Sequence, residues 1–76
     1  MPKSTESPMP TATIKLSSRE REILVLIIEG RSNPEIADAL YLSRNTIKTH
    51  VRSILNKLGV EHRLQAAVVA VRLGLV

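Results

Sequence analysis

Residues 43–58 form a segment with two opposed faces, and this segment most constrains what the chain can fold into. At the helical spacing of about 100° per residue, one stripe is apolar and the opposite stripe is polar. The apolar stripe consists of Ile47, Val51, Ile54, Leu55 and Leu58. The polar stripe consists of Asn45, Lys48, Thr49, Arg52 and Asn56. Ser43 is a typical N-cap and Gly59 a typical helix terminator, so we predict a helix that packs one side on a core.

Basic residues concentrate in and just after this predicted helix. No acidic residue occurs from position 44 to position 60, whereas basic and acidic residues alternate at positions 19–22. The net charge of +4 fits a polyanionic partner, and this placement of the charge adds weight to that interpretation. Tyr41 is the single aromatic residue, so the chain lacks the stacking platforms of proteins that bind single strands. Double-stranded DNA is therefore the favoured partner.

Length and composition argue against several other classes of protein. A chain of 76 residues supports one modest core, which argues against an enzyme with a buried active site. No cysteine and only two separated histidines are present, so we expect no metal site and no cofactor. No stretch approaches the roughly 20 apolar residues that span a bilayer, and the chain does not start like a signal peptide. We expect a cytoplasmic protein with no membrane partner.

The chain divides into an arm and one domain. Residues 1–15 carry three prolines among polar residues and no periodic apolar signal, so we interpret them as a flexible arm. The domain comprises residues 16–76. Its first helix should start after Ser17, which has the capping-box spacing to Glu20, and should end at Gly30.

Three further helices complete the predicted domain. A second, two-turn helix should follow the start signal at residues 32–35, where Pro34 suits the first helical turn. Residues 41–43 then form a tight connection to the helix at 44–58, and a last helix should cover residues 63–73. No alternating strand pattern occurs. We therefore predict an all-α fold, a four-helix bundle that contains a helix-turn-helix.

The position of the polar stripe on the second helix of a helix-turn-helix predicts a DNA interface. Such a helix enters the major groove and reaches base edges, so we interpret part of the stripe as base-reading: Lys48, Thr49 and Arg52, with Asn45 ranked second. Hydroxyl, amide and cationic groups near the helix starts suit phosphates: Ser32, Asn33, Arg44, Thr46 and Lys57. Plain helix capping is the alternative role for Ser32 and Asn33, and both roles can coexist.

The last helix has more apolar surface than one bundle face requires. One side, which we expect to face the bundle, consists of Ala66, Val69, Ala70 and Leu73. The other side consists of Leu64, Ala67, Val68 and Val71. A symmetric homodimer through this helix would cover the second side. The alternative is that the arm folds over it through Met9 or Ile14.

Several short motifs together resemble the LuxR/NarL-type helix-turn-helix domain of bacterial transcription regulators. They are residues 16–22 (LSSRERE), 30–33 (GRSN), 35–37 (EIA), 42–43 (LS), 46–50 (TIKTH), 57–60 (KLGV), 63–66 (RLQA) and 74–75 (GL). The resemblance covers about four fifths of the chain. It implies a domain that binds duplex DNA as a dimer, with the third helix in the major groove and the fourth at the dimer interface.

Carried over by position, the resemblance places Lys48, Thr49 and Arg52 where the family reads bases. It places Thr46, Lys57 and the start of the second helix where the family holds phosphates. Two departures concern the same surface: Pro34 replaces a usual lysine, and residues 44–45 (RN) replace a stretch that is often acidic. We therefore expect a different operator preference.

Two other functions remain as alternatives. One is a fragment similar to the promoter-reading region of a sigma factor, which works as part of RNA polymerase. The other is a protein-interaction module that has kept the bundle and binds, for example, an acidic inhibitor. RNA polymerase is also a potential partner of a DNA-binding regulator. We expect the protein to be a stand-alone regulator. The alternative is that the chain is a fragment of a larger regulator.

Overall fold

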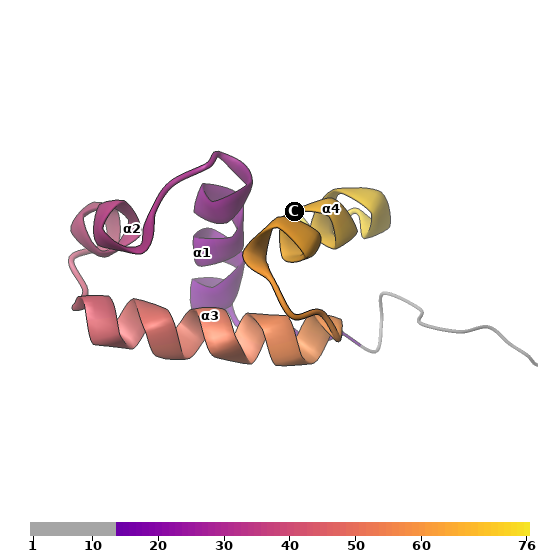
Figure 1. Cartoon of the computed structure of the whole chain (residues 1–76), viewed down its shortest axis with the longest axis horizontal. Helices are drawn as coiled ribbons and strands as arrows, with labels where there is room; N and C mark the ends of the chain where they lie inside the picture. Colours follow the sequence, from indigo (N-terminus) through magenta and orange to yellow (C-terminus); the bar gives the residue numbers. More distant parts are fainter. Residues whose placement is uncertain (1–13) are drawn as a thin grey trace, which may run out of the picture.

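The computed structural model describes residues 14–76, which form four helices (Figure 1). They are α1 (Ser18–Ile28), α2 (Asn33–Leu40), α3 (Arg44–Leu58) and α4 (Arg63–Leu73). No strand occurs in this part of the chain, and the predicted all-α fold is confirmed. No helix between residues 14 and 76 has the length and apolar character needed to cross a membrane. Most of the predicted arm, including Met9, lies outside the described residues.

Side-chain caps start the first two helices. Ser17 Oγ accepts from the Glu20 amide at 3.0 Å, and Glu20 Oε1 accepts from the Ser17 amide at 2.8 Å. Ser32 and Glu35 form the same capping box at the start of α2, with distances of 3.3 and 2.9 Å. Each box satisfies two backbone donors that the helix itself leaves unpaired. The starts of both helices are therefore encoded locally.

The turn between α2 and α3 has an unusual backbone. Tyr41 ends α2 in the left-handed conformation, with φ at 57°, and its side chain is 94% exposed. The Leu42 amide donates to the Ala37 carbonyl at 2.9 Å and closes the turn. A left-handed non-glycine residue costs roughly 1 kcal/mol. This geometry produces the predicted tight connection between the two helices of the helix-turn-helix.

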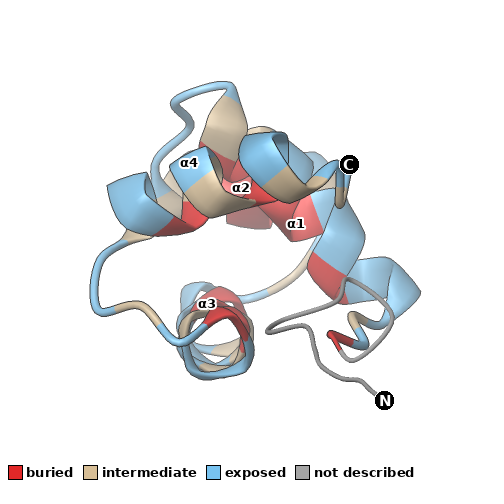
Figure 2. Ribbon diagram, turned by 90° about the vertical axis from the view of Figure 1, so that its right-hand side faces the viewer, coloured by how far each residue is buried: buried red, intermediate tan, exposed pale blue. Residues whose placement is uncertain are grey.

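The core lies between α3 and the other helices. Helices α1, α2 and α4 lie on the same side of α3, with α2 near its start and α4 near its end (Figure 1). The buried parts of the ribbon face this interior (Figure 2). The largest fully buried side chains are Ile23, Leu24, Ile36, Ile47 and Ile54. The predicted apolar stripe of α3 is confirmed, because its members are buried or packed against the core.

Ile14 belongs to this core, although the sequence pattern predicted that it is part of the arm. Its side chain is 8% exposed and lines a groove with Leu58, Val69 and Leu73. A single apolar residue among prolines and polar residues has no periodicity, which is why the pattern did not reveal it. Ile14 therefore packs on the bundle side of α4, and the suggestion that it covers the other side is wrong.

Candidate nucleic-acid interface

The polar face of α3 is exposed along its length. Asn45, Lys48, Thr49 and Arg52 are all exposed, as is Arg44 in the first turn. Within residues 14–76, no carboxylate pairs with Arg44, Lys48 or Arg52. The predicted base-reading residues thus share one surface, which carries cationic groups uncompensated by acids of the described chain.

Thr49 presents a defined part of its side chain to this surface. Its hydroxyl donates to the Asn45 carbonyl one turn earlier, at 3.1 Å. Since the hydroxyl hydrogen is engaged by the helix backbone, the methyl group and the oxygen lone pairs remain for contacts outside the helix. The arrangement favours apolar contact over donation at this position.

The start of α3 combines a cap with a free donor. Ser43 Oγ accepts from the Thr46 amide at 3.0 Å and donates to Thr46 Oγ1 at 2.8 Å. The Thr46 hydroxyl therefore keeps its own hydrogen for an external acceptor. The first turn of α3 contains no acidic residue, so the partial positive charge of the helix start is not neutralised there.

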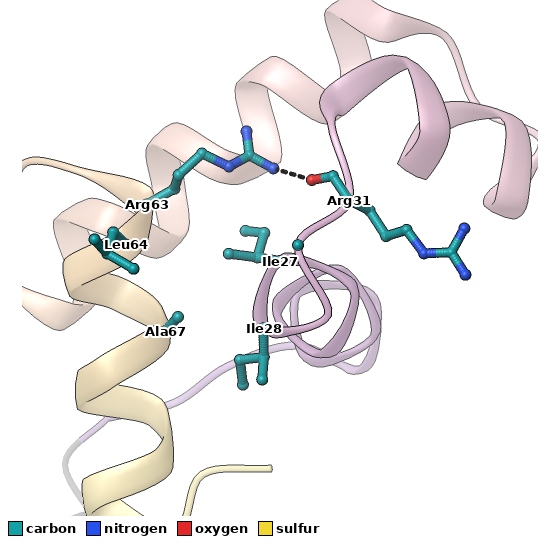
Figure 3. Close-up of a pocket in the computed structure, with 7 residues that line it drawn as sticks. Ile27, Ile28, Arg31, Arg63, Leu64 and Ala67 are labelled. Atoms are coloured by element: carbon teal, nitrogen blue, oxygen red, sulfur yellow. Dashed lines mark hydrogen bonds between the residues drawn. The ribbon is translucent and has the colours of Figure 1, made fainter.

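The start of α2 is tied to α4. Arg63, the first residue of α4, donates through Nη2 to the Arg31 carbonyl at 2.8 Å (Figure 3). It also donates through Nη1 to Asn33 Oδ1 at 2.6 Å. The Ser32 hydroxyl caps α2, as the capping interpretation predicted. Arg63 was not among the predicted site residues, because its partners are some 30 positions away and no local pattern indicates them.

Lys57 lies in a different environment from the other predicted phosphate-binding residues. Its Nζ donates to Glu20 Oε1 at 2.8 Å and to the Lys15 carbonyl at 2.9 Å, and its side chain is 40% exposed. Ser53 Oγ donates to the second carboxylate oxygen, Glu20 Oε2, at 2.7 Å. An ammonium group has three hydrogens, so Lys57 keeps one for an external partner.

Glu20 is a buried carboxylate, only 5% exposed, although the sequence indicated only its role in the cap of α1. Burial alone would raise its pKa. Hydrogen bonds from Lys57, the Ser17 amide and Ser53, with the charge of Lys57, outweigh burial and lower the pKa to about 2. Helical spacing could have indicated the burial of Glu20, because Glu20 shares one face of α1 with Ile23, Leu24 and Ile27.

The outer side of α4 is an exposed apolar stripe. Leu64, Val68 and Val71 are 74%, 44% and 63% exposed, and their spacing places them on one face. The predicted inner side is confirmed: Ala66 and Ala70 are fully buried, and Val69 and Leu73 pack on the core. Ala67 is half-buried and lines a groove with Ile27 and Ile28 of α1 (Figure 3). It therefore lies at the edge of the stripe.

Comparison with known proteins gives consistent matches. The family model described as bacterial regulatory proteins, luxR family, matches residues 15–70. The chain is 52% identical over 61 residues to the transcriptional regulatory protein LiaR of Bacillus subtilis, covering 80% of this chain and 29% of LiaR. It is 44% identical over 73 residues to the uncharacterized transcriptional regulatory protein YhcZ of the same organism, covering 96% of this chain and 34% of YhcZ.

A solved structure of the transcription factor GerE has a similar fold. The TM-score is 0.73 at 39% sequence identity, and the match covers 78% of this chain and 88% of the GerE chain. The response regulator protein VraR of Staphylococcus aureus is 49% identical over 61 residues, which cover 80% of this chain and 29% of VraR. The chain thus spans about a third of the length of the curated relatives it matches.

Proposed function

Since the chain belongs to the luxR family of bacterial regulatory proteins, we propose that it is a sequence-specific regulator of transcription that binds double-stranded DNA as a homodimer. The observation that carries this proposal is the exposed face of α3, which is basic, free of acids and presented by the second helix of a helix-turn-helix. An enzymatic role has no support from this family.

Base reading is assigned to the middle of α3. Lys48 and Arg52 lie one turn apart and can donate to the O6 and N7 atoms of guanine in the major groove, which is about 12 Å wide. Thr49 offers its methyl group to thymine, in keeping with its internally bonded hydroxyl. The Asn45 amide can pair with adenine. These contacts would supply the sequence preference.

Phosphate binding is assigned to the flanks of this helix. The Thr46 hydroxyl, the Arg44 guanidinium and the start of α2 with Ser32 and Asn33 provide donors around α3. Lys57 contributes its remaining hydrogen at the far end of α3. Contacts of this kind supply affinity and orientation for any sequence.

Dimerisation is assigned to the outer stripe of α4. A two-fold axis beside α4 would bury Leu64, Val68 and Val71 of both copies, with Ala67 allowing close approach at the edge. Two reading helices then contact two half-sites on one face of the duplex. Where such a site overlaps a promoter, contact with RNA polymerase or its exclusion would set the sign of regulation.

Titration of labelled random-sequence duplex at several salt concentrations, followed by selection and sequencing of the bound fraction, tests this function. With about 6 to 10 phosphates neutralised per dimer, the log–log slope of affinity against salt should lie near −5 to −9. We expect an enriched motif with two-fold symmetry. Steep salt dependence without enrichment contradicts sequence-specific reading, and no binding at physiological salt contradicts the DNA-binding function altogether.

A further inference from the structure

We propose that Arg63 is a positioning residue for DNA binding, which holds the Asn33 side-chain amide with its oxygen inward and its NH₂ group presented to a phosphate. The inference rests on the proposed function and deepens it, because it assigns a role in phosphate binding to a residue of α4. Arg63 itself need not touch DNA. Its contribution comes from the orientation of Asn33 at the start of α2.

The geometry of the contact is a fork. Two nitrogens of one guanidinium reach two neighbouring points of the chain, Asn33 Oδ1 at 2.6 Å and the Arg31 carbonyl at 2.8 Å. Figure 3 shows the second of these bonds. A planar guanidinium supplies two donors in a fixed relation, which a lysine ammonium does not. The fork therefore fixes the side chain of Arg63 against the segment that leads into α2.

The fork decides which end of the amide faces out. An asparagine amide has an acceptor oxygen and a donor nitrogen, and rotation about its last bond exchanges them. A guanidinium only donates, so the Asn33 oxygen must face Arg63. A reversed amide would place its oxygen towards the phosphate, where two acceptors repel.

The Asn33 nitrogen is free to meet a ligand. Within residues 14–76, no group forms a hydrogen bond with Asn33 Nδ2. In the same residues, every side-chain polar atom that is shielded from solvent has a hydrogen-bond partner, provided that its residue is buried or half-buried, as Asn33 is. An atom of Asn33 without a partner must therefore be in contact with solvent. Nδ2 is therefore accessible. The neighbouring guanidinium charge adds to the attraction for a phosphate at this point.

The substitution Arg63→Lys tests the proposal because it keeps the positive charge and removes the fork. We expect the affinity for duplex, specific or unrelated, to fall about fivefold in fluorescence anisotropy, in line with loss of one hydrogen bond of ordinary strength. In an Asn33→Ala background, Arg63→Lys should have almost no further effect. Arg72→Lys, at an exposed position of the same helix, is the matched control and should bind like the wild type.

A fivefold loss that persists in the Asn33→Ala background overturns the proposal, as does wild-type affinity of Arg63→Lys. The wild-type protein offers a second measurement, which does not compare the affinities of variants. The Asn33 side-chain NH₂ signals, assigned by their absence in Asn33→Ala, should shift in ¹⁵N NMR spectra on addition of duplex. Unchanged NH₂ signals overturn this inference alone if the duplex binds, whereas wild-type protein that binds no duplex overturns the proposed function itself.

Discussion

Lys48 and Lys57 are the same residue type in one helix, yet their surroundings give them different roles. Lys48 is exposed and has no carboxylate partner within residues 14–76, whereas Lys57 donates to the buried carboxylate of Glu20. The sequence pattern placed both on a DNA interface. Glu20 is 37 positions away from Lys57 in the sequence. No local pattern could therefore show that Lys57 also joins two helices, whereas Lys48 is free to bind DNA.

At this scale the three cationic residues of α3 should respond differently to substitution. We predict that Lys48→Ala or Arg52→Ala costs about 1 to 3 kcal/mol on the preferred site and relaxes sequence preference. Lys57→Ala should weaken all sequences alike and also lower the melting temperature, since it leaves Glu20 without its cationic partner. Anisotropy titrations on preferred and scrambled duplexes, with thermal melts, distinguish these cases. Equal losses on both duplexes for all three variants would falsify the assignment of roles.

The helices show how far local signals extend. The starts of α1, α2 and α3 and the end of α3 at Gly59 were predictable, since Ser-capped starts and a terminal glycine act within a few residues. The left-handed Tyr41 was not, because nothing in its side chain favours that conformation. Burial of Glu20 and Ile14, and the Arg63 fork, depend on contacts between elements distant in sequence.

The contact between α1 and α3 should make stability depend on pH. The folded-state pKa of Glu20, about 2, lies below its ordinary value of 4.5, which applies to the unfolded chain. Its stabilisation is therefore complete above the unfolded value and is lost as pH falls from about 4.5 to 2. The pKa difference corresponds to about 3 kcal/mol.

Urea unfolding between pH 2 and pH 7 measures this contribution. Glu20→Gln should unfold at lower urea at neutral pH and should lose the dependence on pH that Glu20 contributes below pH 4.5. Glu22→Gln is the matched control, because Glu22 is an exposed acid of the same helix that pairs with Arg19. Parallel pH profiles for the wild type and Glu20→Gln would contradict the role of the buried carboxylate.

On the scale of the whole molecule, the outer stripe of α4 predicts the oligomeric state. Sequence spacing identified its apolar character and the structure confirms the exposure of Leu64, Val68 and Val71. The structure of a single copy does not identify the surface that covers the stripe. Dimerisation therefore stays a prediction.

We expect Val68→Glu to abolish the dimer without unfolding the domain, because the site is 44% exposed and the new charge would be buried only between copies. Sedimentation equilibrium with an excess of operator duplex should then give one copy per duplex instead of two, and anisotropy titrations should give a salt slope about half that of the wild type. Val25→Glu, at an exposed site on α1, is the control and should leave both unchanged. An unaltered stoichiometry for Val68→Glu would exclude α4 as the interface.

The bond between Lys57 and the Lys15 carbonyl has a mechanical consequence. The backbone enters the domain at this point, and a single ammonium group joins it to the C-terminal end of the helix proposed to read DNA. Because the neighbouring Ile14 is buried in the core and the Lys15 carbonyl is bonded to α3, the segment that leads into α1 is anchored at two adjacent residues.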